Sequence, residues 1–314
     1  MSKPKQRSYL PYLALAAGIL ALTLSPMFAR WAEASGPVFA FHRMASAAIV
    51  LLPFFIREQR QAGSLSLWPW AIFGILGGLA NALDLTTWFA AIHYTRVANA
   101  TLLNNIAPLW VALFAWLVYK ERLRGLFWGG LATALAGAAY MLGADFIYRP
   151  SLNTGNLIGL ASSFFYATYY LLTQRGRIHL SALQYTYIMT LSSGLSTFIF
   201  SVISGAQLAG FSWQTYLAFI GAGVVTQSIG FLSLAYALGR LPASLVSATM
   251  ILQPILSAVL AIPLLGESLA SSQWIGGAAV LGGIYLVNGS LDNEAKDTAE
   301  GATSALPPKQ GEST

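Results

Sequence analysis

Long apolar segments alternate with short polar breaks along most of the chain. Each apolar segment has about 20 residues, the length that an α-helix needs to cross the hydrocarbon core of a bilayer. The breaks carry charged residues, glycine or proline, which end helices. The pattern predicts an all-α integral membrane protein with transmembrane helices at residues 10–29, 36–56, 69–92, 97–118, 124–143, 154–174, 181–203, 213–238, 242–264 and 270–288.

The chain contains part of this pattern twice. When the sequence is shifted by 146 positions, residues 108–143 align with residues 254–289 without a gap, and 11 of the 36 positions are identical. An internal repeat of this size fixes the architecture. We therefore expect two five-helix repeats, at residues 10–143 and 154–289, preceded by a short N-terminus at 1–9 and followed by a disordered tail at 290–314.

Five helices per repeat is an odd number, so the second repeat starts on the opposite side of the membrane from the first. Such inverted-topology repeats are a common plan of secondary transporters. Thirteen of the 17 basic residues fall on the side that carries both termini, three fall on the other side, and Arg43 lies within a helix. The positive-inside rule places both termini in the cytoplasm.

Composition excludes several classes of protein. Only 9% of the residues are charged, against about 25% in a soluble domain. The chain has no cysteine, so it has neither disulfides nor cysteine-based metal sites, and its three histidines show no ligand spacing. We expect no cofactor, no metal and no nucleic-acid partner, because topology explains the positive net charge. No phosphate-binding loop occurs, so ATP hydrolysis by this chain is not expected.

Two pairs of motifs give the chain a family resemblance. They are HYTRVANATLLNNIAPLWVAL at 93–113 with ERL at 121–123, and LPASLVSATMILQPILSAVLA at 241–261 with GESL at 266–269. With the two five-helix halves, they resemble EamA-type members of the drug/metabolite transporter superfamily over residues 8–290. The resemblance implies ten helices, a bacterial inner-membrane location, no nucleotide-binding module, and export of small metabolites such as amino acids.

Two ionisable residues within the predicted helices are the main candidates for chemistry, because charge in a membrane span is costly. Arg43 and Asp84 lie about 10 and 12 Å from the same membrane face at 1.5 Å per residue, and Asn104 and Asn105 match them in depth. A structural ion pair is one interpretation of Arg43 and Asp84. The other is a site for a substrate or a proton.

The remaining candidates are polar or aromatic residues at similar depth. Trp88 lies one helical turn from Asp84, and Tyr166 and Tyr170 share a helix face, which suits either packing or a binding wall. Gln227 and Gln253 lie near mid-bilayer, where each needs a hydrogen-bond partner, as helix contact or as site residue.

Proline, glutamate and glycine residues shape the predicted helices. Pro108 and Pro254 predict kinks, either static or used in gating. Glu121 and Glu267 precede helices 5 and 10 and are expected to cap them. Helices 5 and 10 are rich in glycines suited to close packing, within one chain or across a dimer. They are Gly129, Gly130, Gly137, Gly276, Gly277, Gly282 and Gly283.

The sequence therefore favours a secondary transporter that exports small amphipathic metabolites, with a small-molecule substrate, the lipid bilayer and protons as partners, as a monomer or homodimer. An importer of metabolites or drugs with the same fold is one alternative, and a scaffold or receptor is another, although the short loops offer little docking surface. An intramembrane enzyme is not expected, because no HExxH, GxSxG or paired catalytic carboxylates occur within the helices.

Overall fold

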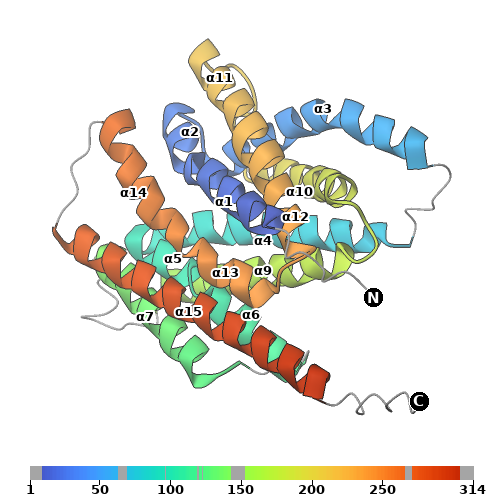
Figure 1. The fold of residues 1–314 in the computed structure, drawn as a ribbon. Coiled ribbons are helices and arrows are strands. Elements are labelled where there is room, and N and C mark those ends of the chain that lie inside the picture. The colour runs from blue at the N-terminus through green and yellow to red at the C-terminus, as the bar shows by residue number, and fades with distance from the viewer. Residues whose placement is uncertain are drawn as a thin grey trace, which may run out of the picture.

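The computed structural model describes residues 9–62, 69–95, 97–118, 120–121, 123–142, 153–265 and 271–304. Within them the chain is helical in all ten predicted segments, which confirms the all-α fold (Figure 1). The first half consists of α1 (Leu10–Thr23), α2 (Ser25–Trp31), α3 (Gly36–Ala62), α4 (Ala71–Tyr94), α5 (Val97–Asn104), α6 (Ala107–Leu117) and α7 (Gly125–Leu142). The second half consists of α9 (Thr154–Gly176), α10 (Ala182–Ile203), α11 (Trp213–Gly221), the π-helix η1 (Ala222–Phe231), α12 (Leu232–Leu238), α13 (Ala243–Met250), α14 (Leu252–Leu265) and α15 (Ser271–Ser304).

By length and composition, seven of the described helical segments can cross a membrane. They are Leu10–Trp31, Gly36–Gln61, Ala71–Tyr94, Asn99–Leu117, Ala182–Ile203, Trp213–Leu238 and Ala243–Leu264, and the shorter apolar helix Gly125–Met141 adds to them. Many large side chains on the outside are apolar, such as Leu195 and Ile229. A lipid environment accounts for this surface, which would be unfavourable in water.

The helix boundaries repeat with the spacing of the sequence repeat. Val97 starts α5 and Ala243 starts α13, which is 146 residues later, and α7 and α15 start 146 residues apart as well. The interruption between α5 and α6 begins at Asn105, and its equivalent is Ile251, between α13 and α14. The two halves therefore share a fold down to the position of a broken helix.

The last helices of the two halves, α7 and α15, pack side by side (Figure 1). A Cβ atom on Gly130 would lie 2.7 Å from the carbonyl oxygen of Gly283, and one on Gly137 would lie 2.7 Å from that of Gly276. Gly130, the earlier glycine of α7, meets Gly283, the later glycine of α15, so the two helices are antiparallel. Because they are equivalent in the repeat, this crossing is what an inverted repeat requires.

The predicted close packing of glycines thus occurs within one chain at Gly130, Gly137, Gly276 and Gly283. Gly129 and Gly282 have open space where a Cβ atom would lie, and they take no part in the crossing.

Helices of the two halves also interleave in the centre of the bundle. In the first half, α4 packs against α9 and α10, and in the second half η1 packs against α1 and α3. The buried core between them includes Tyr169, Tyr185 and Leu234. Several helices of the second half begin at polar N-caps, as where Ser181 and Gln184 form a capping box at α10.

The tail differs from the expectation of disorder from residue 290. Helix α15 continues to Ser304, whereas residues 305–314 lie outside the described part of the chain. The segment DNEAKDTAE contains alanine, glutamate and lysine, which have high helix propensity. Such residues can continue a helix without being buried.

We expect reporter fusions to confirm the orientation that the basic residues predict. Fusions at Arg60 and Arg177 should give a cytoplasmic signal, and fusions at Ser35 and Arg149 an external one. Paired alkaline phosphatase and fluorescent protein reporters measure this, with expression level as the control. A cytoplasmic signal at Arg149 would contradict an inverted arrangement of the halves.

Candidate functional site

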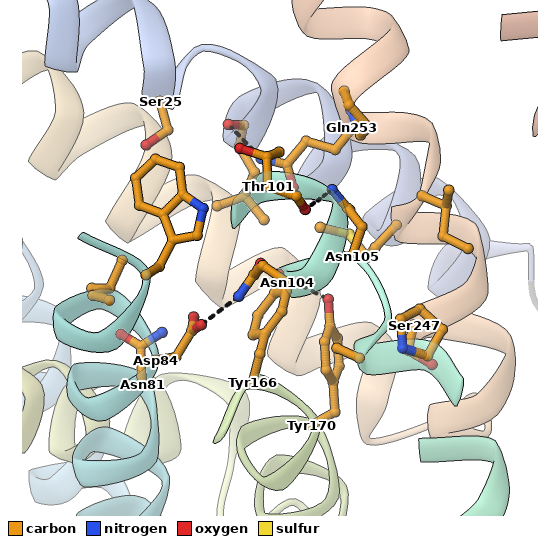
Figure 2. Close-up of a pocket in the computed structure, with 18 of the residues that line it drawn as sticks. Ser25, Asn81, Asp84, Thr101, Asn104, Asn105, Tyr166, Tyr170, Ser247 and Gln253 are labelled. Atoms are coloured by element: carbon orange, nitrogen blue, oxygen red, sulfur yellow. Dashed lines mark hydrogen bonds between the residues drawn. The ribbon is translucent and has the colours of Figure 1, made fainter. Parts of the chain in front are cut away.

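A cavity of about 230 Å³ lies between the two halves of the bundle (Figure 2). Helices of both halves line it, including the interrupted segments α5–α6 and α13–α14. All but one of the sequence candidates for substrate or proton binding contribute to it: Arg43, Asp84, Trp88, Asn104, Asn105, Tyr166, Tyr170 and Gln253. The cavity also contacts Pro108 and Pro254.

The carboxylate of Asp84 is positioned by an amide. Asp84 is buried on α4, and its Oδ1 accepts a hydrogen bond of 2.6 Å from Nδ2 of Asn104, as Figure 2 shows. The same amide donates to the Ser162 hydroxyl at 3.0 Å. Asn104, on α5, therefore links α4 and α9 through its amide group, and the Asp84 residue that it holds lines the cavity.

The guanidinium of Arg43 lies at the same cavity and is equally buried. Its Nη1 donates to Oγ of Ser25 at 3.2 Å, and its Nε has no hydrogen-bond partner among the described residues. Its Cζ lies 6.0 and 5.8 Å from the ring centroids of Phe39 and Phe231. A guanidinium has five donors, so most of its capacity is unused by the described side chains.

Within the described residues, Arg43 and Asp84 share the cavity without forming a direct ion pair. A purely structural ion pair would have its charges in contact, because only close geometry compensates for their burial. The arrangement instead presents an acid and a base, each held by a neutral partner, to the same enclosed space.

Aromatic side chains form part of the cavity wall. Tyr170 donates a hydrogen bond of 2.9 Å to the Tyr166 hydroxyl, and both rings face the cavity from α9 (Figure 2). Tyr169, next to Tyr170 on α9, packs into the core beside Phe231 instead. Trp88 is half-buried on α4, one turn from Asp84. The aromatic wall offers an apolar surface next to the charged groups.

The predicted kinks are complete breaks in the helices. Pro108 lies in the first turn of α6, and its ring excludes the carbonyl of Asn104, four residues earlier, from the helical pattern. Asn105 lies in the break and donates to the carbonyl of Thr101 at 2.9 Å (Figure 2). Pro254 has the equivalent place in the first turn of α14.

A third break, which was not predicted although Pro26 is its signal in the sequence, separates α1 from α2 at Leu24. Pro26 has no N–H for the carbonyl of Leu22, and Gln253 Nε2 donates to that carbonyl at 3.2 Å instead. Gln253 therefore joins α14 to α1 and also lines the cavity, and its role as a site residue stays a prediction.

Gln227 is the one candidate that the structure does not bring to the cavity. It lies fully buried in η1 and donates to the Thr190 hydroxyl at 3.1 Å. The wider turn of a π-helix changes which face of the helix each side chain occupies. The hydrogen bond of Gln227 to Thr190 is a contact between η1 and α10.

The capping of helices 5 and 10 by Glu121 and Glu267 stays a prediction, and the structure adds a contact of Glu121 with the other half of the chain. Glu121 accepts a hydrogen bond of 3.1 Å from Ser244, at the start of α13 in the other half. The carboxylate therefore lies at the N-terminus of α13, where the helix dipole also favours it. Glu267 lies outside the described residues.

Sequence reasoning missed several polar residues of the cavity. Asn81 is one turn before Asp84 on α4 and accepts a hydrogen bond from Ser193, while Thr101 precedes Asn104 by one turn. Their positions at i−3 from a candidate could have identified them. Ser25 and Ser247 carry no such signal, because serine is common throughout these helices.

Comparison with known proteins decides the family. The model of the EamA-like transporter family matches residues 10–143 and 153–289, one match for each half. The chain belongs to this family. It is therefore a multi-pass membrane transporter and not an enzyme.

Curated relatives of this EamA protein are mostly transporters without a known substrate. It is 28% identical to an uncharacterized inner membrane transporter, YicL, of Salmonella typhimurium, over 82% of this chain and 86% of that one. It is 27% identical to a probable terminal-alkyne amino-acid exporter of Streptantibioticus cattleyicolor, over 67% and 71%. A solved crystal structure with 20% identity has the same fold, with a TM-score of 0.74 over 90% of this chain and 98% of the other.

We expect Pro108→Ala and Pro254→Ala to reduce transport while insertion and expression stay near normal. Each change supplies a backbone N–H that allows the helix to continue through its break. Transport by equal amounts of purified protein in proteoliposomes measures the effect. Pro53→Ala is the matched control, because Pro53 lies exposed within the continuous helix α3. Full activity of the double variant would show that the breaks are incidental.

Proposed function

We propose that this EamA transporter exports small zwitterionic metabolites, most simply α-amino acids, by alternating access. The observation that carries the proposal is the pair of Arg43 and Asp84, which line one cavity without pairing directly. An α-amino acid carries a carboxylate and an ammonium group. It would meet the unused donors of Arg43 at one end and the Asp84 carboxylate at the other.

The size and lining of the cavity support a small substrate. Its volume of about 230 Å³ is below the range of about 300–1,000 Å³ typical of drug-sized ligands. Trp88, Tyr166 and Tyr170 would contact the apolar part of the substrate. The amides of Asn104 and Asn105 would hydrogen-bond its polar groups.

The exposure of the lining residues supports access from one side. Ser25, Trp88 and Thr101, towards the predicted external face, are partly exposed, whereas Tyr170, Ser247 and Met250, towards the cytoplasm, are buried. This corresponds to an outward-facing conformation. An inverted repeat can form the inward-facing one when its halves exchange conformations.

The direction and location rest on the relatives. One of them is named as a probable amino-acid exporter and another as an inner membrane transporter, which supports export across the inner membrane. The distribution of basic residues supports both termini in the cytoplasm. Asp84 is also the residue that would carry a proton if export is coupled to the proton gradient. An importer would use the same cavity in the other direction.

Resistance and transport assays test the proposal together. Cells that overexpress the protein should tolerate toxic amino-acid analogues better than cells with an empty vector. Proteoliposomes should exchange labelled amino acids, and amino-acid amides, which lack the carboxylate, should compete poorly. Equal competition by an amide and its parent amino acid would contradict the role of Arg43. The absence of any exchange across a panel of amino acids would exclude the substrate class.

A further inference from the structure

A second, apolar groove of about 650 Å³ lies on the membrane-facing side of α6 and α9. On α9 its lining residues Phe164, Thr168, Leu171 and Arg175 share one helix face, and on α6 Trp110, Phe114 and Leu117 do so. The indole Nε1 of Trp110 donates to Ser163 at 2.9 Å. The groove therefore offers hydrocarbon surface along its length and a charge only at Arg175.

The groove has the length of one bilayer leaflet. From Phe164 to Arg175, α9 rises about 16 Å at 1.5 Å per residue, close to half of the roughly 30 Å hydrocarbon core. Arg175 lies at the end of α9 that the positive-inside rule places in the cytoplasm. An acyl chain of the inner leaflet would reach from the surface to mid-bilayer within this groove.

A polar recess of about 430 Å³ adjoins the charged end. Arg175 lines both the recess and the groove, and Arg240 and Gln174 also line the recess. The exposed Arg175 guanidinium has no hydrogen-bond or ion-pair partner among the described residues. Arg240 lies with its Cζ 3.8 Å from the ring centroid of Tyr236, and its Nη1 donates a hydrogen bond of 3.5 Å to the Tyr236 carbonyl. A guanidinium has five N–H donors, so others remain for a ligand.

The recess carries an excess of positive charge. Glu121 is the one carboxylate among the residues that line the recess, and it accepts a hydrogen bond from the Ser244 hydroxyl. Arg177 lies behind the recess, where Gly239 approaches its guanidinium. Burial, together with the charge of Arg240, lowers the pKa of Arg177 to about 10. A headgroup with a negative charge would complement this surface, and a neutral one would not.

We propose that the groove and the recess together bind one anionic phospholipid of the inner leaflet, with its phosphate at Arg175 and Arg240 and an acyl chain between α6 and α9. Basic pockets at the cytoplasmic ends of transmembrane helices bind such headgroups. The lipid would lie on the backs of two helices whose other faces, with Pro108 on α6 and Tyr170 on α9, line the central cavity.

Lipid binding to the purified full chain tests this proposal without a transport assay. Native mass spectrometry would follow titration with phosphatidylglycerol and with phosphatidylcholine of the same acyl chains. We expect tighter binding of phosphatidylglycerol. Arg175→Gln should weaken it about fivefold, the effect of one arginine near an anionic headgroup, while phosphatidylcholine binding stays unchanged. Thr168→Trp should fill the groove and weaken both lipids.

Arg60→Gln is the matched control, because Arg60 is an exposed arginine at the predicted cytoplasmic end of α3, and it should leave both affinities unchanged. Equal binding of the two lipids by the wild type, or unchanged phosphatidylglycerol binding by Arg175→Gln, would overturn the proposal. So would displacement of the lipid by millimolar inorganic phosphate, which would indicate a site for soluble anions. A dimer that excludes lipid from the groove would assign this face to a second copy of the chain.

Discussion

Asp84→Asn is expected to weaken amino-acid binding at least tenfold at every pH. The amide keeps the size of the side chain but removes the charge that would meet the substrate ammonium, and a hydrogen bond to a charged group contributes about 1.5–3 kcal/mol. Arg43→Met should have a similar effect through the substrate carboxylate. Isothermal titration or competition binding with purified protein measures both. Thr87→Val is the control on α4, because the Thr87 hydroxyl bonds to the carbonyl of Leu83 on its own helix.

Two other outcomes would assign Asp84 a different role. If Asp84 carries protons, Asp84→Asn should abolish gradient-driven transport but spare substrate exchange. If the two charges are only structural, either single change should destabilise the fold by about 3 kcal/mol, and removing both should restore it. A well-folded Arg43→Met/Asp84→Leu variant with wild-type transport would exclude the substrate and proton roles together.

Gly137→Ala is expected to destabilise the bundle by about 1–3 kcal/mol, the usual effect of overpacking. Its new Cβ atom would lie 2.7 Å from the carbonyl oxygen of Gly276 and 2.8 Å from the amide nitrogen of Val280. Both are backbone atoms, which cannot rotate away, so α7 and α15 would have to separate. Unfolding in a detergent titration measures the loss of stability.

Gly129→Ala is the matched control for this change. Gly129 lies on the same helix, with nothing within 4 Å of a Cβ atom at that position. Alanine favours helix over glycine by up to about 1 kcal/mol, so stability should stay the same or rise slightly. Equal stabilities of the Gly137→Ala and Gly129→Ala variants would show that the close crossing contributes little.

The sequence predicted the helices and most of the candidate residues that line the central cavity, because both depend on position along the helix axis. Apolar length sets the membrane spans, and depth alone brings Arg43, Asp84 and Asn104 into one layer. The repeat added the equivalence of the two broken helices, at Pro108 and Pro254. Each of these features is a spacing that can be counted in the chain.

The features that escaped prediction depend on rotation about the helix axis and on contacts between helices. Gln227 was expected at the site, but it lies in a π-helix, for which the sequence gives no signal, and it faces α10 instead of the cavity. Glu121 was expected to cap its own helix, and its contact with Ser244 depends on how the two halves pack. The hydrogen bond of Gln253 to Leu22 joins residues 231 positions apart and depends on packing in the same way.

The antiparallel glycine crossing also constrains how this protein can move. When the two halves exchange conformations, as we propose, every helix contact takes over the geometry of its repeat equivalent. For the contact of Gly130 with Gly283, the equivalent is that of Gly276 with Gly137, which joins the same two helices. The exchange therefore leaves this crossing unchanged, and α7 and α15 act as a fixed pivot about which the helices lining the cavity rearrange.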